Sequence, residues 1–509
     1  MPDSMIVFLC DQLRADFLPA YGCRAFSTPN LDRLAARGVV FDRAITQSTV
    51  CAPARASMMT GRYVSDHQVW TNDVPFRPGM ETIAQRLNRL GYATGAFGKL
   101  HHFPADDPKG FRFARQMEEG RLGEREPYLQ WLRQRRPEAR RVFNFENRRF
   151  LYTEEEYYEH WIASEAIGFI ERQAEARQPF LAWISFQGPH TPLDPPAATA
   201  RACDASLLPP VVRRSAVDEA RDPSVVRHRR ALVPPMSGET ILANRVAYAE
   251  MIVEIDRQIG RVIDRLESLG LFDSTLIVFS ADHGDLLGDF GLNAKGPFPY
   301  QAQMGIPMIV ANHPALKPGS RSQALAGNID IAGTLLDAAG DERPLGQSRS
   351  LIDLAQAEPR HPRAVNFCEF CDSVKTAEDE RFRLCYYPFE GATELFDLQA
   401  DPKQLVNLSG QPHYAAEEAR LLARLVDLAA LAKGVRVEAH DFTFEQQNAL
   451  RALHPGYRED FPVAYPLNAR ERQSLLKAGL DANYNEFCKT KPIQAKYRTP
   501  YWEEPPEAQ

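Results

Sequence analysis

The chain has 509 residues, enough to bury a large core, and its 44% hydrophobic and 25% charged residues are typical of a globular protein. With 60 Lys and Arg residues against 67 Asp and Glu residues, the formal net charge is −7. This charge excludes a general attraction to nucleic acid or to an anionic membrane surface. The sequence contains no apolar run of about 18 residues, so we expect no membrane span.

The first apolar run, residues 5–10, is too short for a secretory leader and has no basic flank. We therefore expect a cytoplasmic protein. The same run is typical of a strand that is buried on both faces. Similar strands are predicted over residues 179–187 and 274–281, and a further one is predicted to end near Gly98.

Helical periodicity separates these strands. Apolar residues recur at helical spacing over residues 80–90, and a longer stripe runs from 242 to 269. Strands that alternate with helices predict an α/β fold built on a mostly parallel sheet. Each predicted strand is followed by side chains that can bind ions or transfer protons. These residues are Asp11, Lys99, His101, His190, Asp282 and His283.

The carboxyl ends of parallel strands meet at one edge of a sheet, so we expect these side chains to lie close together. Asp and His side chains bind divalent metals, whereas Lys supplies a fixed positive charge. Histidine can also exchange a proton near neutral pH. The sequence thus predicts a metal and anion site at this edge of the sheet.

A second group of residues belongs to the segment 49–63. Cys51 is followed by Pro53 and Arg55, then by a good helix-forming stretch that ends before Gly61. Cys51 is therefore predicted to lie at a helix N-terminus, where backbone N–H groups and the helix dipole favour an anion. Arg55 is one turn further on and can point to the same end of the helix.

The pattern Cys51-x-Pro53-x-Arg55 followed by Thr60-Gly61-Arg62, together with the stretch from Gly91 to His101, resembles the signatures of type I formylglycine-dependent sulfatases. These enzymes belong to the alkaline phosphatase superfamily, and the resemblance extends over residues 5–410. It implies that a maturation enzyme oxidises Cys51 to formylglycine. It also implies that the hydrated aldehyde attacks sulfur and is regenerated when the resulting hemiacetal releases sulfate.

The resemblance also implies roles for individual residues. One divalent metal is expected, most simply Ca²⁺ although Mn²⁺ is also compatible, with Gln12 and Asp285 as possible helpers. His190, together with Lys295, would protonate the leaving oxygen, and His101 would accept the proton of the second hydroxyl. The expected metal ligands are Asp11, Cys51, Asp282 and His283. The expected catalytic residues are Cys51, Arg55, Lys99, His101, His190 and Lys295, and the substrate-binding residues are Asn72, Lys99, His190 and Lys295.

Three functions remain open at this stage. The preferred one is a sulfuric ester hydrolase acting on a small-molecule sulfate ester. A phosphonate monoester or phosphodiester hydrolase would use nearly the same site, and Asp11-Gln12 is the pair found in that branch. That branch typically replaces the Lys-x-His element, which is intact here as Lys99-Leu100-His101. A non-catalytic binding protein on the same scaffold would have lost part of this set of residues.

The expected fold is a large mixed, mostly parallel α/β sheet of the alkaline-phosphatase type, with a smaller C-terminal α+β domain. We expect a catalytic domain over residues 1–374 and an antiparallel sheet with a helix over 375–440. Residues 441–509 would form a C-terminal extension, which suggests an arm for homo-oligomerisation. The segments 102–160 and 195–235 are predicted to be long excursions that contact the leaving group.

Overall fold

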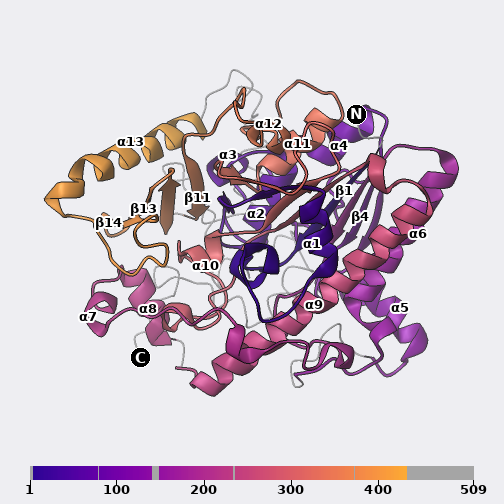
Figure 1. Cartoon of the computed structure of the whole chain (residues 1–509), viewed down its shortest axis with the longest axis horizontal. Helices are drawn as coiled ribbons and strands as arrows, with labels where there is room; N and C mark the ends of the chain where they lie inside the picture. The colour runs from indigo at the N-terminus through magenta and orange to yellow at the C-terminus, as the bar shows by residue number, and fades with distance from the viewer. Residues whose placement is uncertain (1–3, 78, 140–147, 233–234, 372, 433–509) are drawn as a thin grey trace, which may run out of the picture.

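The computed structural model describes residues 4–77, 79–139, 148–232, 235–371 and 373–432. An eight-stranded sheet forms its centre (Figure 1). In sheet order the strands are β5 (Phe113–Gln116), β4 (Ala93–Gly98), β6 (Phe180–Ser185), β1 (Ser4–Cys10), β7 (Thr275–Ala281), β8 (Met308–Ala311), β2 (Gly38–Phe41) and β9 (Ser320–Ser322). The five strands from β5 to β7 are parallel, whereas β8 is antiparallel to both β7 and β2. The predicted mixed, mostly parallel sheet is confirmed.

The first predicted strand, β1, lies in the middle of this sheet. All of its residues are buried, and Val7 pairs with Trp183 on β6 and with Val278 on β7. Both of its backbone edges are therefore used and both of its faces are covered. This environment explains why the strand reads as a continuous apolar run instead of an alternating one.

The helices form two packed groups that flank the sheet. In one group α9 (Gly238–Ser268) lies beside α6 (Tyr158–Ala176) and α1 (Pro29–Ala36), as Figure 1 shows. In the other group α11 (Asp330–Ala338) packs on α2 (Cys51–Thr60) and α4 (Ile83–Arg89). Further elements are α3 (Val64–His67), α5 (Pro127–Arg135), α7 (Ala216–Glu219), α8 (Ser224–Leu232), α10 (Gln301–Met304), α12 (Leu351–Leu354), β3 (Ala44–Ile45) and β10 (Ala326–Gly327).

A second, four-stranded sheet lies at one end of the molecule, on the left in Figure 1. Its antiparallel strands are β11 (Asn366–Phe370), β12 (Val374–Glu378), β13 (Phe382–Tyr387) and β14 (Ala392–Asp397), and α13 (Ala415–Ala432) packs on β12 and β13. The predicted C-terminal α+β unit is thus present. Its first strand precedes the expected domain boundary at residue 375, and the division into domains remains a prediction.

The two predicted excursions contain regular structure. Residues 102–160 include β5 and α5, and residues 195–235 include α7 and α8, and their predicted contact with the leaving group remains a prediction. Within the described ranges β5 pairs only with β4, at the edge of the sheet, and therefore needs no long apolar run. The C-terminal extension 441–509, with its predicted role in oligomerisation, lies outside the described residues.

None of the helices in the described ranges is both long and apolar enough to cross a bilayer.

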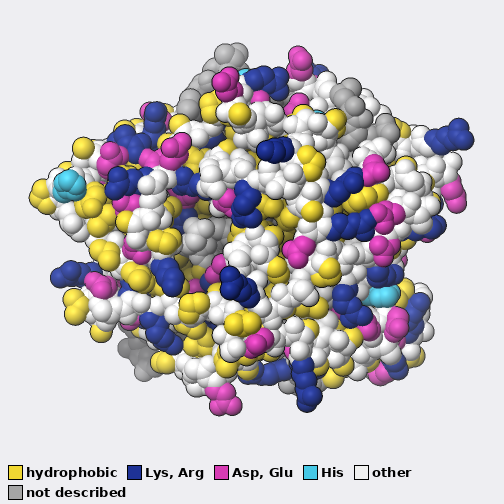
Figure 2. All heavy atoms as spheres, in the orientation of Figure 1, with side chains coloured by type: hydrophobic (Ala, Val, Ile, Leu, Met, Phe, Trp, Pro, Cys, Tyr) yellow, Lys and Arg dark blue, Asp and Glu magenta, His cyan; other side chains and the backbone are white. Residues whose placement is uncertain are grey.

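On the face shown in Figure 2, Lys and Arg side chains are scattered among Asp and Glu side chains and form no continuous basic stripe. The opposite charges on this face therefore balance each other over short distances.

A buried carboxyl group near the sheet edge gives the protein a pH-dependent stability. Asp194 accepts a hydrogen bond from the Tyr158 hydroxyl at 2.8 Å, and burial raises the pKa of Asp194 to about 8. In the unfolded chain this group ionises near pH 4. Raising the pH from about 4 to about 8 therefore favours the unfolded chain, because only that state releases the proton.

Asp194→Asn is expected to reduce the loss of stability between about pH 5 and about pH 8, since the neutral amide can still accept the Tyr158 hydrogen bond. Urea denaturation midpoints at the two pH values measure the effect. Asp264→Asn is the matched control, because the Asp264 side chain is 74% exposed. An unchanged pH dependence in Asp194→Asn would contradict the assignment.

Candidate active site

The carboxyl edge of the large sheet brings the predicted polar side chains together. Strands β1, β4 and β7 end directly before Asp11, Lys99 and Asp282, and β6 ends five residues before His190. These strands are neighbours in the sheet and parallel. Residues that are far apart in the sequence therefore meet in one place, as the strand pattern predicts.

Helix α2 presents Cys51 to this edge. The helix begins at Cys51, all of its residues are buried, and Gly61 ends it with a φ of 63°. The Cys51 Sγ atom lies 3.7 Å from Asp11 Oδ1, 3.3 Å from His283 Nε2 and 2.5 Å from Lys295 Nζ. The segment singled out in the sequence thus lies at the centre of the site.

The thiol itself is a poor nucleophile in this environment. Burial, followed by the carboxylate of Asp11, raises the pKa of Cys51 to about 11, although Lys295 and Lys99 act in the opposite direction. The unmodified side chain is therefore protonated near neutral pH, and a thiolate mechanism is disfavoured.

Asp11, Cys51, Asp282 and His283 form a cluster that can hold a metal ion. Their potential ligand atoms all lie within 4.8 Å of one another, and all four residues are buried. Burial lowers the pKa of His283 to about 4, and its Nδ1 lies 2.9 Å from the Gly284 carbonyl oxygen. The imidazole is therefore neutral, and Nε2 on the Cys51 side has the lone pair that a metal needs.

Gln12 lies next to this cluster. Its backbone N–H donates to Asp282 Oδ1 at 2.9 Å, and its side-chain amide nitrogen donates to Asp285. Among the described residues its Oε1 is buried without a hydrogen-bond partner. A buried oxygen in this position is suited to a cation, so the donor set fits a hard divalent metal.

Arg55 holds the two carboxylates in place. Its Nε donates to Asp282 at 2.8 Å and its Nη2 to Asp11 at 3.1 Å. Its Nη1 donates to the Ser185 hydroxyl at 2.8 Å and to the Lys99 carbonyl at 2.5 Å. The guanidinium thus contacts the ends of four strands and is only 1% exposed, and its catalytic role remains a prediction.

Two lysines supply positive charge. Lys99 Nζ lies 2.7 Å from Asp11 and 2.9 Å from Glu119, and Lys295 Nζ lies 3.7 Å from Asp11. Burial alone would raise the pKa of Asp11, but these lysines, together with His190 and Arg55, hold it well below its usual range. The Asp11 carboxyl group is therefore ionised near neutral pH and can bind a metal ion without first losing a proton.

The remaining predicted residues occupy different positions. His190 Nδ1 lies 2.6 Å from the Thr191 carbonyl oxygen and 3.4 Å from Glu119, and burial holds the pKa of His190 well below its usual value. Asn72 Oδ1 accepts the backbone N–H of Ala52 at 3.1 Å, so it lies at the N-terminal end of α2.

His101 is also close to the end of β4. It is 5% exposed and has a φ of 56°, and its backbone N–H donates to the Glu118 carboxylate. In the described part of the chain its Nδ1 has no hydrogen-bond partner. The structure therefore places His101 close to Lys99 at the end of β4, and its role as a proton acceptor remains a prediction.

The sequence did not indicate Glu118, Glu119 or Gln187. The two glutamates follow β5, and Gln187 follows β6, where its amide donates to Glu119 at 2.5 Å. No motif marks these residues. A pair of acidic residues directly after a short strand was the only available signal.

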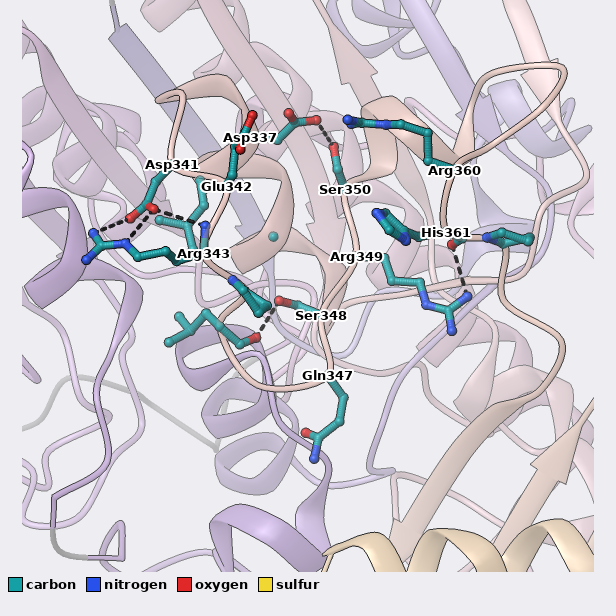
Figure 3. A pocket seen from close by; sticks show the side chains of 15 residues that line it. Asp337, Asp341, Glu342, Arg343, Gln347, Ser348, Arg349, Ser350, Arg360 and His361 are labelled. Atoms are coloured by element: carbon teal, nitrogen blue, oxygen red, sulfur yellow. Dashed lines mark hydrogen bonds and ion pairs between the residues drawn. The ribbon is translucent and has the colours of Figure 1, made fainter. Parts of the chain in front are cut away.

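A cavity of about 780 Å³ lies at the end of α11 and is lined by none of the site residues above (Figure 3). In its wall Asp341 pairs with Arg343 at 2.8 Å, Asp337 accepts a hydrogen bond from the Ser350 hydroxyl, and Arg349 donates to the His361 carbonyl at 3.0 Å. The backbone N–H of Gln347 in its wall donates to the Gly61 carbonyl at 2.6 Å. This cavity thus adjoins the opposite end of α2 from Cys51.

Comparison with known proteins agrees with this geometry. The family described as "Sulfatase" matches residues 4–341, and the family described as "N-sulphoglucosamine sulphohydrolase, C-terminal" matches residues 288–430. An arylsulfatase of Clostridium perfringens is 27% identical over 446 residues, which cover 81% of this chain and 92% of the relative. The multifunctional alkaline phosphatase superfamily protein PehA of Trinickia caryophylli is 30% identical over 488 residues. The matched region covers 81% of this chain and 92% of PehA.

Among solved structures, the phosphonate monoester hydrolase of Agrobacterium radiobacter is similar, with a TM-score of 0.75 and 26% identity. The similarity covers 85% of this chain and 96% of that hydrolase. The family matches span both sheets and include every site residue discussed above. The chain therefore belongs to the sulfatase family of the alkaline phosphatase superfamily, and it is a sulfatase enzyme.

Proposed function

We propose that this sulfatase hydrolyses small or aryl sulfate monoesters with a formylglycine made from Cys51 and one divalent metal ion. The observation that carries the proposal is the buried cluster of Asp11, Cys51, Asp282 and His283, with Lys295 in contact with Cys51. It combines a metal-binding donor set with a positively charged group around a single reactive position. A maturation enzyme is required to convert the cysteine.

Ca²⁺ is the proposed metal, because two carboxylates dominate the donor set, while the imidazole also admits Mn²⁺. Asp11, Asp282, His283 and the oxygen of residue 51 would hold it, with Gln12 Oε1 as a further oxygen donor. When bound, the metal would offset negative charge on the sulfuryl oxygens, and the hydrated aldehyde would supply the attacking hydroxyl.

The side chains around this centre have distinct tasks in the proposal. Lys99 and Lys295 bind the negatively charged sulfuryl group, where charge accumulates in the transition state. His190 donates its Nδ1 hydrogen to the Thr191 carbonyl, which leaves Nε2 to exchange a proton with the leaving oxygen. His101 accepts the proton from the second hydroxyl group of the hydrated formylglycine. Conversion of Cys51 also removes the difficulty of a thiol that stays protonated near neutral pH.

Hydrolysis of phosphonate monoesters or phosphodiesters is the second candidate. The similarity to the phosphonate monoester hydrolase of Agrobacterium radiobacter and the pair Asp11-Gln12 favour it. Sulfate and phosphonate monoesters have similar charge and shape, so one site can accept both. The intact Lys99 and His101 favour the sulfate ester.

Matched aryl sulfate and aryl phosphonate esters test this proposal. We expect kcat/KM to be at least about 10-fold higher for the sulfate, a difference of about 1.4 kcal/mol in transition-state stabilisation. A chelator should abolish both activities, and added Ca²⁺ should restore them. A preference for the phosphonate would make the second candidate correct. Metal-loaded protein with formylglycine that hydrolyses neither ester would overturn both.

A further inference from the structure

Glu119 is a buried carboxylate in contact with two site residues, Lys99 and His190, and the proposed reaction assigns it no role. It lies three residues after β5, has a φ of 57°, and its side chain is 7% exposed. Its Oε1 accepts hydrogen bonds from Lys99 Nζ at 2.9 Å and from Gln187 Nε2 at 2.5 Å, and lies 3.4 Å from His190 Nδ1. A single oxygen atom thus contacts residues that follow two different strands.

The turn that carries Glu119 is firmly attached to the end of β4. The Glu118 carboxylate accepts the backbone N–H groups of Leu100 and His101 at 2.7 Å and 3.1 Å, and Arg121 pairs with Glu118 at 2.6 Å. The backbone beside Lys99 is therefore held by Glu118, and its ammonium group is held by Glu119. The two adjacent acids act on the same short segment.

Lys99 shows what this arrangement does for an anionic substrate. An ammonium group has three N–H donors. Asp11 at 2.7 Å and Glu119 at 2.9 Å use two of them and fix the direction of the third. A lysine held only by Asp11 could rotate about that contact, and its charge would then lie in several places instead of one.

His190 requires a similar support. Its ring is buried beside two lysines, and both burial and these positive charges disfavour the protonated imidazole. Glu119 and Asp11 act in the opposite direction, and Glu119 is in direct reach of the ring nitrogen. The Thr191 carbonyl accepts the Nδ1 hydrogen, and the nearby Glu119 carboxylate stabilises the positive charge of the ring when it carries a second proton.

We propose that Glu119 is a positioning residue that fixes Lys99 and His190 relative to each other, and thereby couples binding of the sulfuryl group to protonation of the leaving oxygen. This inference rests on the proposed sulfate-ester hydrolysis. The effect of Glu119 on the rate should depend on the leaving group of the ester. Cleavage of an alkyl sulfate needs a proton on the departing oxygen, whereas the p-nitrophenolate released from p-nitrophenyl sulfate departs with little help.

Glu119→Gln tests the inference, because it keeps the size of the side chain and removes the charge. With p-nitrophenyl sulfate, kcat is expected to fall about 10-fold with little change in KM; with an alkyl sulfate, kcat should fall at least about 100-fold. Glu119→Asp, which keeps the carboxylate, should recover part of the activity on the alkyl ester. Glu124→Gln is the matched control, since Glu124 lies on the same segment and is 80% exposed.

Equal losses with both esters, or no loss, would overturn the inference while leaving the proposed function intact. Lack of hydrolysis by the wild-type enzyme would instead contradict the proposed function. In that case crystal structures of the wild type and Glu119→Gln still decide the matter. A displaced Lys99 ammonium group or His190 ring in the variant supports the positioning role, and unmoved side chains contradict it.

Discussion

Replacing Cys51 with alanine is expected to abolish sulfate-ester hydrolysis and to leave the fold intact. The substitution removes the only side chain in the cluster that can become an aldehyde, and the loss of a nucleophile typically costs at least about four orders of magnitude in kcat/KM. The fold should survive, because alanine is small and helix-forming at the first position of α2. Hydrolysis of p-nitrophenyl sulfate and a thermal unfolding curve measure the two effects.

Mass spectrometry of the same position gives an independent check. In active enzyme from a host with a maturation system, the peptide containing residue 51 should be about 18 Da lighter than the cysteine form, since an aldehyde oxygen replaces the thiol. Cys203→Ala is the matched control, because Cys203 is a half-buried thiol outside the metal cluster. Fully active enzyme with only the intact thiol at Cys51 would refute the formylglycine assignment.

Asp282→Asn is expected to lower the metal content of the purified enzyme and to reduce kcat/KM at least about 1,000-fold. A bound metal contributes several kcal/mol of transition-state stabilisation, and each 1.4 kcal/mol corresponds to about a factor of ten. Asp282 also accepts Arg55 Nε at 2.8 Å and the backbone N–H of His283 at 2.8 Å. The amide cannot balance the charge of Arg55, so the variant should also unfold at a lower temperature.

Elemental analysis and titration with Ca²⁺ separate these effects. We expect about one metal ion per wild-type chain, and partial recovery of the variant at high Ca²⁺ because its affinity is reduced. Asp273→Asn is the control near the other end of β7, where the side chain is 82% exposed. Full metal content and full activity in Asp282→Asn would exclude Asp282 as a ligand. Two tightly bound ions in the wild type would indicate a different metal centre.

Much of the site could be predicted because its residues follow local patterns. Asp11, Lys99 and Asp282 come directly after buried strands, and parallel strands place their carboxyl ends at one edge. The start of α2 at Cys51 follows from Pro53 and the helix-forming residues after it. The two signatures, from Cys51 to Arg62 and from Gly91 to His101, can be recognised because each occupies a short, continuous stretch of the chain. They indicate the proposed chemistry.

The sequence by itself therefore determined the mixed α/β sheet, the helix that carries Cys51 and the group of side chains around it. Only the tertiary structure decided how those side chains are held. The signature predicts a catalytic charge at Arg55, and the structure adds that its guanidinium group donates to Asp11 and Asp282. No motif marks Glu119, because its position depends on the pairing of β5 with β4, and its partners come from two separate turns. Such contacts between distant segments are set by packing and leave no periodicity in the chain.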